Sequence, residues 1–199
     1  MNFLAHFYLS ENKPKIIVGN FLGDFITRKQ RENIEQEILQ GVFLHYAIDD
    51  FTDRHHLVKQ GRETLFAHFG KYAAVITDVY LDYFLAKKWQ SFCKTPLPEF
   101  AEMVYTTLET HQELFDLKAK MTYEHMRKNN WLTNYAKREG IERTMQGLSQ
   151  RANHENKVFD AAAYLFDNEF FWENIFDRFF PELEIFCAES LRKIISEKF

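Results

Sequence analysis

Apolar residues recur every three or four positions through most of this chain, and no segment shows a convincing alternation of apolar and polar residues. That periodicity is typical of helices that bury one face. Only seven glycines and four prolines interrupt the 199 residues, which favours long helices over a β protein rich in turns. No repeat, low-complexity segment or linker divides the chain. We therefore expect an all-α fold, a single-domain helical bundle spanning residues 1–199.

The expected helices follow from this periodicity and from the positions of proline and glycine. Residues 28–33 are polar and are expected to form a connection. The last third of the chain predicts two helices or one helix broken at Pro181. The other helices are expected at about residues 2–10, 14–27, 34–57, 62–68, 72–91, 98–115, 121–127, 130–138 and 141–152.

The overall charge and the cysteines exclude several classes of protein. A net charge of -4 and a pI near 6.1 argue against a general nucleic-acid binder. Cys93 and Cys187 are too few for a disulfide framework and lack metal-type spacing. The start of the chain has no basic signal-peptide region, and no apolar run approaches the length of a membrane span. We expect a reduced, cytoplasmic protein with no membrane or nucleic-acid partner, and the oligomeric state is left open.

One stretch, 41-GVFLHYAIDDFTD-53, places charged groups where a helix should bury its apolar face. His45, Asp49 and Asp53 are spaced four apart, so on a helix they form one stripe. The same stripe contains Ile38 and Val42, which are typical core residues. A histidine and two carboxylates are therefore predicted to point toward the protein interior.

A second stretch, 74-AVITDVYLDYFLAKKW-89, repeats the pattern. Asp78 and Asp82 interrupt an apolar row that contains Val79 and Leu85. Two like charges at this spacing repel each other by roughly 0.2–0.5 kcal/mol even on an exposed helix, and burying them unpaired costs several kcal/mol more. These acids need a partner, which is an arginine, a shared proton or a metal ion.

For any single aspartate, a salt bridge or a helix cap is the simpler interpretation. Two features favour a metal site instead. The nearest basic residues lie at the ends of both predicted helices, and two separate helices show the same anomaly. Helical bundles commonly build metal sites from ligands four residues apart, and a mixture of imidazole and carboxylate suits Mn²⁺, Fe²⁺ or Zn²⁺, with many carboxylates favouring Mn²⁺ or Mg²⁺.

Further candidates lie nearer the start of the chain. Asp24, in 19-GNFLGDFI-26, is another acid among apolar residues, and the glycines there are expected to allow close helix packing because the stretch is no phosphate loop. His6 is either a buried core histidine or a ligand. His55 and His56 are either outer groups of the site or a solvated helix end. No GxSxG motif occurs and neither cysteine has a histidine nearby, so metal-activated water is predicted, not covalent catalysis.

Four motifs in the same order, MNFLAHFYLS, 19-GNFLGDFI-26, 41-GVFLHYAIDDFTD-53 and 77-TDVYLDYFLAKKW-89, resemble the acyl carrier protein phosphodiesterase family. The resemblance continues more weakly through 131-WLTNY-135, 147-GLSQR-151 and the late FFPEL. It implies a cytoplasmic bacterial enzyme that hydrolyses the phosphodiester joining 4′-phosphopantetheine to a serine of holo-acyl carrier protein. It also implies a divalent metal, preferably Mn²⁺, and a fold distantly related to the HD phosphohydrolases, although the chain lacks their adjacent His-Asp pair.

The resemblance also implies roles for individual residues. One or two Mn²⁺ ions, or another divalent metal such as Mg²⁺ or Fe²⁺, are expected to be held by a subset of the matched histidines and aspartates. The catalytic residues are expected to be Asp24, His45, Asp49 and Asp53, with Asp53 orienting water or carrying its proton. The expected metal ligands are His6, Asp24, His45, Asp49, Asp78 and Asp82.

Acyl carrier protein is strongly acidic, so an enzyme with a net charge of -4 needs a local positive rim to bind it. Lys87, Lys88 and Arg28, which follow the acidic motifs, are the expected rim, with Lys29 and Arg31 beside Arg28. Two other functions remain open. One is an HD-like metal phosphohydrolase that acts on a nucleotide or another small phosphoester, and the other is a non-catalytic helical binding module with salt-bridged acids.

Overall fold

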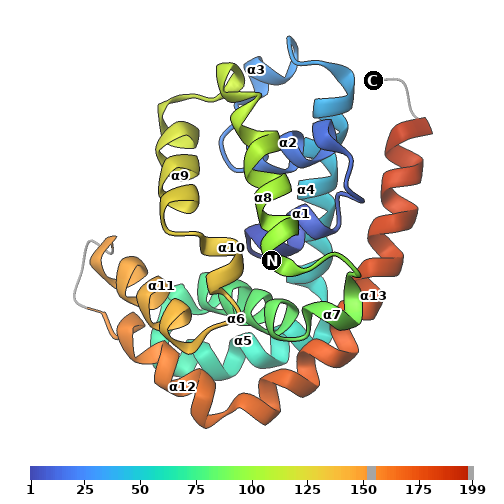
Figure 1. Ribbon diagram of the computed structural model, residues 1–199. Helices are drawn as coiled ribbons and strands as arrows, with labels where there is room; N and C mark the ends of the chain where they lie inside the picture. Colours follow the sequence, from blue (N-terminus) through green and yellow to red (C-terminus); the bar gives the residue numbers. More distant parts are fainter. Residues whose placement is uncertain (152–155, 197–199) are drawn as a thin grey trace.

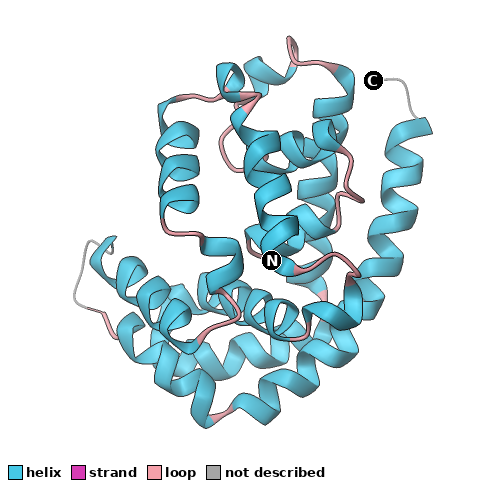
Figure 2. Cartoon of the chain, in the orientation of Figure 1, coloured by secondary structure: helices cyan, strands magenta, loops and turns pink. Residues whose placement is uncertain are grey.

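The computed structural model describes residues 1–151 and 156–196, and every regular element within these ranges is a helix (Figure 1, Figure 2). The prediction of an all-α fold is confirmed. Within those ranges, no helix has the length and apolar character needed to cross a bilayer. The helices are α1 Phe3–Tyr8, α2 Pro14–Leu22, α3 Arg28–Arg31, α4 Gln36–Arg54, α5 His56–Phe69, α6 Ala73–Lys87, α7 Trp89–Phe92, α8 Leu97–Glu109, α9 Leu117–Lys128, α10 Trp131–Asn134, α11 Arg138–Arg151, α12 Ala161–Asp167 and α13 Glu169–Ser196, with 3-10 turns η1 Gly70–Tyr72, η2 Gln112–Leu114 and η3 Val158–Asp160.

Helices α2 and α4 lie with their backbones in contact because each presents a glycine to the other. A Cβ atom at Gly19 would lie 1.9 Å from the carbonyl oxygen of Ile38, and one at Gly41 would lie 2.3 Å from the carbonyl oxygen of Ile16. The predicted role of the glycine at position 19 in close packing is confirmed. This contact sets the distance between the end of α2 and the middle of α4, where the candidate site residues lie.

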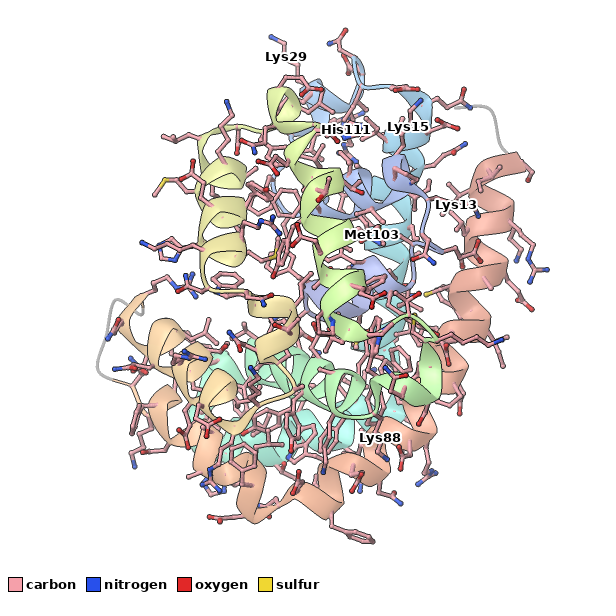
Figure 3. The ribbon with its side chains drawn as sticks, in the orientation of Figure 1. Lys13, Lys15, Lys29, Lys88, Met103 and His111 are labelled. Atoms are coloured by element: carbon pink, nitrogen blue, oxygen red, sulfur yellow. The ribbon has the colours of Figure 1, made fainter. Side chains whose placement is uncertain are left out.

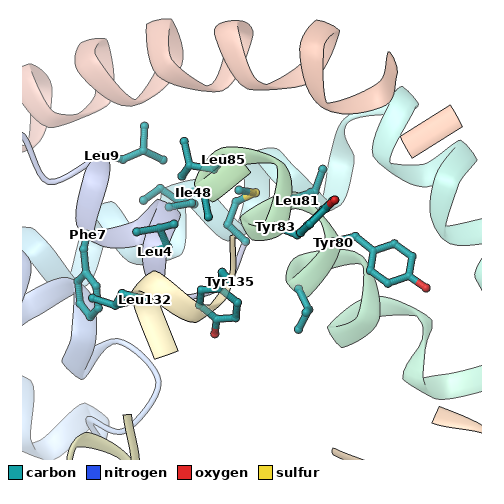
Figure 4. Close-up of a cluster of buried hydrophobic side chains, with 14 of the residues drawn as sticks. Leu4, Phe7, Leu9, Ile48, Tyr80, Leu81, Tyr83, Leu85, Leu132 and Tyr135 are labelled. Carbon is teal, nitrogen blue, oxygen red and sulfur yellow. The ribbon is translucent and has the colours of Figure 1, made fainter. Parts of the chain in front are cut away.

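Side chains fill the space between the helices (Figure 3), and one apolar cluster joins elements that are far apart in the sequence. Leu4 of α1, Ile48 of α4 and Leu85 of α6 lie together in this cluster and are fully buried (Figure 4). Helix α13 runs along the outside of α4, α5 and α6 (Figure 1). Helices α1, α4 and α6, which carry most of the candidate residues, are therefore held by a common core.

The first helix ends differ from the predictions. Helix α2 ends at Leu22 and not at residue 27, because the chain turns at Gly23. Thr27 instead caps α3 through a capping box with Gln30, so residues 28–33 contain a short helix and are not only a connection. Helix α4 ends at Arg54 and not at residue 57, since His55 is extended with a ψ of 128° and separates it from α5.

Later boundaries also differ. Helix α6 ends at Lys87 and α8 at Glu109, both earlier than expected. Two helices do form in the last third, but α13 continues through Pro181 without a break. The buried faces of Phe179, Phe180 and Leu183 pack against the core on both sides of the proline, and this burial outweighs the loss of one helical hydrogen bond. Residue 152, the expected end of the helix at 141–152, lies outside the described residues, as do residues 197–199.

Candidate metal centre

The turn that follows α2 rests on the imidazole of His45 in α4. A Cβ atom at Gly23 would lie 2.3 Å from Cγ of that ring, so a residue with a side chain would displace it. Asp24, the next residue, is held with its Oδ1 3.6 Å from Nε2 of His45. The amide of Phe25 donates to the carbonyl oxygen of Leu22 at 2.9 Å and closes the turn.

Asn20 of α2 orients two buried histidines at once. The Nδ1 of His6 donates to the side-chain oxygen of Asn20 at 2.7 Å, and the Nδ1 of His45 donates to its main-chain oxygen at 2.9 Å. The side-chain nitrogen of Asn20, Nδ2, is itself held by hydrogen bonds that it donates to the carbonyl oxygen of His6 and to Oγ of Ser10. The two rings stack with centroids 4.4 Å apart. Because both Nδ1 atoms are donors, the Nε2 atom of each neutral ring carries a free lone pair.

Both Nε2 atoms point to the carboxylate of Asp49. Its Oδ1 lies 3.2 Å from Nε2 of His6, and its Oδ2 lies 3.2 Å from Nε2 of His45. The imidazoles are 5% exposed, whereas the side chains of Asp49 and Asp24 are 43% and 51% exposed. The cluster therefore has a buried nitrogen side and an oxygen side that a substrate can reach from solvent.

The start of the chain lies beside this cluster. The α-ammonium group of Met1 donates to Oδ1 of Asp78 at 3.2 Å and lies 3.7 Å from Oδ1 of Asp49. Burial by itself lowers the pKa of this ammonium group, but Asp78, Asp49 and Asp82 outweigh that effect and raise it. Asp78 of α6 is thus placed next to the carboxylate of Asp49, and the α-ammonium group lies between the two.

Asp82 is buried, as its place in the apolar row predicts, and its partners belong to the main chain. Its side chain is completely buried, its Oδ1 accepts a hydrogen bond from the amide of Asn2 at 3.2 Å, and its Oδ2 accepts one from the amide of Leu4 at 2.8 Å. Both oxygens are therefore used to cap the first turn of α1. Asp82 therefore holds the helix that carries His6, and it is not one of the three residues whose ligand atoms converge. Its predicted role as a metal ligand stays a prediction.

Asp53 is also placed apart from the cluster. Its side chain is 62% exposed and pairs with Nη2 of Arg62, on α5, at 2.7 Å. The expectation of a solvated helix end is wrong for His55, because this residue is buried and its Nε2 lies 3.2 Å from Oε2 of Glu182 in α13. The same expectation is confirmed for His56, which is exposed. The turn at the end of α4 thus sends these side chains toward α5 and α13.

Electrostatics within the cluster favour a shared cation. Burial lowers the pKa of His6, and the neighbouring His45 lowers it further. Burial also acts to lower the pKa of His45, but Asp24 and Asp49 together raise it to about 9. Burial acts to raise the pKa of Asp49, yet the two histidines hold it well below its usual range. The raised pKa of His45 favours a proton on this imidazole, which together with the ammonium group of Met1 offsets the charge of the neighbouring carboxylates.

The donor set fits a divalent metal ion. His6, His45 and Asp49 each offer one ligand atom, and the three atoms lie within 4.8 Å of one another. Two imidazole nitrogens with carboxylate oxygens suit Mn²⁺, Fe²⁺ or Zn²⁺. The neutral imidazole nitrogens and the carboxylate oxygens face one another, so a cation bound among them would be stabilised by all of these electron pairs.

The sequence reasoning did not identify Asn20. This residue is 1% exposed and forms part of the quoted stretch 19-GNFLGDFI-26, four positions before Asp24. An asparagine on the apolar face of a short helix is a signal of a satisfied buried polar group. That signal was present, but its two histidine partners lie 14 and 25 positions away, and no spacing rule connects them.

The chain matches a protein family described as acyl carrier protein phosphodiesterase over residues 1–183. It is 29% identical to an acyl carrier protein phosphodiesterase from Yersinia enterocolitica, over 92% of this chain and 95% of the relative. A protein of the same name from Escherichia coli O157:H7 is 27% identical, over 98% of this chain and 100% of the relative. No solved structure matches the chain. With nearly its whole length covered and the sequence motifs in the same order, this chain belongs to the acyl carrier protein phosphodiesterase family.

Proposed function

We propose that this chain is a metal-dependent phosphodiesterase that hydrolyses the bond between 4′-phosphopantetheine and the serine of holo-acyl carrier protein, giving apo-acyl carrier protein. Its relatives carry the name acyl carrier protein phosphodiesterase. The observation that supports the proposal most directly is the convergence of two buried imidazoles on the half-exposed carboxylates of Asp24 and Asp49. A phosphodiester can reach such a site from solvent, and the site is suited to a divalent ion.

The residues that would hold the ion are His6, His45 and Asp49, with Asp24 and Asp78 beside them. Mn²⁺ is the ion we expect, with Mg²⁺ or Fe²⁺ as alternatives. When bound, a divalent ion makes water more acidic and offsets the negative charge of the phosphodiester. Asn20 would keep both imidazoles in the tautomer that binds metal through Nε2.

In the reaction, the oxygen of water bonds to phosphorus, the bond from phosphorus to the serine oxygen breaks, and a proton passes to that oxygen. Asp24 is suited to accept the proton of water, because its carboxylate is the more exposed of the two that face His45. Its pKa is lowered because His45 outweighs the opposing effect of burial, so it is ionised and able to act as a base. Asp24 thus takes the role that the sequence assigned to Asp53.

The carrier protein is not expected to dock at Lys87 and Lys88. The Nζ of Lys87 lies 2.9 Å from Oε1 of Glu169, and the Nζ of Lys88 lies 3.0 Å from Glu173 and 2.5 Å from Asp177. All three acids belong to α13. Because these lysines already have carboxylate partners, they offer little free positive charge to an acidic protein.

The basic residues of α3 are the better docking rim. Arg28, Lys29 and Arg31 form no ion pair with any carboxylate in the described part of the chain, and they follow Asp24 by a few residues. Figure 3 shows Lys29 and Lys88 at opposite ends of the molecule, so the two possible rims are separate surfaces. We therefore propose that holo-acyl carrier protein approaches over α3.

The deciding experiment incubates the purified protein with holo-acyl carrier protein and Mn²⁺ and follows the mass of the carrier protein. Loss of the mass of phosphopantetheine, abolished by a chelator and in Asp49→Asn, is the expected result. An unchanged carrier protein together with rapid hydrolysis of a small phosphoester would replace this proposal with the small-molecule phosphohydrolase. Absence of both activities and of stoichiometric metal would leave a non-catalytic helical module.

A further inference from the structure

A hollow of about 310 Å³ lies at the end of α2, beside the candidate metal centre. Apolar side chains from α2, from η2 and from the connections on either side of α3 form most of its wall. Its polar side chains are Lys29 and Gln30 of α3, Asn33 just after α3, and Asp116 at the start of α9. Ligand pockets in proteins occupy about 300–1,000 Å³, so this hollow suits a slender molecule. Its apolar residues are Leu22, Phe25, Ile26, Ile34 and Leu114.

One turn of the chain joins this hollow to the metal centre. Leu22 and Phe25 form part of its wall, and Asp24, between them, faces His45. Gly23, in the same turn, packs directly on the ring of His45. A molecule attached to a phosphate at Asp24 therefore needs to extend only past this turn to enter the hollow.

The hollow contains two side-chain amides with unused hydrogen-bonding capacity. Gln30 accepts hydrogen bonds from Thr27 through its Oε1, which leaves its amide nitrogen free to donate. The side chain of Asn33 forms no hydrogen bond with any residue in the described ranges. Both belong to the segment around α3. A ligand with amide groups of its own would satisfy these side chains, whereas a purely aliphatic one would not.

Positive charge flanks the same hollow. Lys29 lines it, and the Nζ of Lys118 lies 5.4 Å from the ring centroid of Phe25. One acid, Asp116, also lines it, and its carboxylate accepts a hydrogen bond from the amide of Ala119. Neither lysine forms an ion pair with a carboxylate of the described chain. The combination of apolar wall, free amides and cations matches an aliphatic, amide-containing chain that carries a phosphate and is attached to an acidic protein.

We propose that the hollow is the subsite for the pantetheine arm of the phosphate that water attacks, with its methyl and methylene groups against the apolar wall and its amides against Gln30 and Asn33. The inference rests on the proposed function for the identity of the arm. It adds the place where the arm binds, and it predicts that a diester without an arm is a poorer substrate. Binding energy from the arm holds the phosphate in position at Asp24.

The test fills the hollow without touching the metal centre. Leu114→Trp places a large side chain at its edge, and Leu117→Trp, on the 76% exposed position three residues later, is the matched control. For Leu114→Trp we expect a KM for holo-acyl carrier protein raised roughly tenfold or more, the scale of pocket contacts. Hydrolysis of bis(p-nitrophenyl) phosphate, which has no arm, should be unchanged in both variants. An unchanged KM in folded Leu114→Trp would overturn the proposal.

A second variant and a direct binding measurement cover the remaining outcomes. Asn33→Leu is on an exposed position, so it should fold, and it should raise the same KM several-fold by removing an amide partner. Pantetheine without phosphate should bind the wild-type protein in ligand-observed NMR and lose this signal in Leu114→Trp. If pantetheine binds but holo-acyl carrier protein is not hydrolysed, the proposed function fails and the subsite stands. If hydrolysis occurs but pantetheine does not bind, the subsite assignment is wrong.

Discussion

At the scale of single residues, one asparagine sets the chemistry of both histidines. The side-chain oxygen of Asn20 accepts a hydrogen bond from His6, and its main-chain oxygen accepts one from His45. Two different oxygens of the same residue thus leave both Nε2 atoms available as ligands. The charge states still differ, because His6 has a lowered pKa and His45 one of about 9. The two imidazoles are alike in orientation and unlike in protonation.

This difference predicts how many protons metal binding releases. Near pH 7.5 the metal-free protein should carry a proton on His45 and none on His6, so binding of one Mn²⁺ should release about one proton. The affinity for Mn²⁺ should increase as the pH rises toward 9, because the proton that competes with the metal leaves His45. Calorimetry in buffers of different ionisation enthalpy measures the number directly. His45→Gln should release none, and release of two protons by the wild type would contradict the assignment.

At the scale of elements, α1 depends on a carboxylate from α6. Asp82→Ala would leave the amides of Asn2 and Leu4 without an acceptor, and we expect the free energy of unfolding to fall by about 2–3 kcal/mol. Metal affinity should fall as well, because α1 carries His6. Asp116→Ala is the matched control, since Asp116 caps α9 through the amide of Ala119. For Asp116→Ala, urea unfolding should show a free energy of unfolding lower by about 1 kcal/mol, and the affinity for metal should be unchanged.

The contact between α2 and α4 predicts opposite effects for the same substitution at two glycines. Gly41→Ala would place a methyl group 2.3 Å from the backbone of Ile16, and we expect it to destabilise the protein by about 3 kcal/mol. Gly147→Ala, in α11, meets nothing within 4 Å and should stabilise it by about 0.5–1 kcal/mol. Thermal and urea unfolding of both variants and of the wild type measure these changes in the free energy of unfolding. Equal effects would show that helix propensity, and not packing, decides at position 41.

The helices themselves could be predicted because their apolar periodicity is local, whereas several of their ends and partners could not. The end of α4 at Arg54 depends on how His55 and Glu182 meet across 127 positions. Likewise, the spacing of Asp78 and Asp82 correctly indicated acids that need a partner, but not that the start of the chain provides it. The sequence predicted that Asp24, His45 and Asp49 lie together, because their helix positions face the interior and because of the family resemblance. The family itself is confirmed by the match over residues 1–183.

At the scale of the whole molecule, a bound metal should stabilise the fold. Acids and histidines from α1, α4 and the turn after α2 meet at one point, so an ion there holds these segments together. At free Mn²⁺ of 100 times Kd, the stabilisation should be about 2.7 kcal/mol. Differential scanning calorimetry with and without a chelator tests this, with Asp49→Asn as the control that should not respond. A melting temperature that does not depend on metal in the wild type would count against a metal site.

The acids of α13 have an effect beyond the helices they join. By neutralising Lys87 and Lys88, they remove one source of attraction from a molecule whose total charge is already -4. On the proposed docking over α3, the basic residues of that helix would guide a diffusing polyanion. Such a partner would be oriented toward the turn of Asp24 before the two surfaces touch, and added salt should then slow its capture more than it slows the turnover of captured molecules.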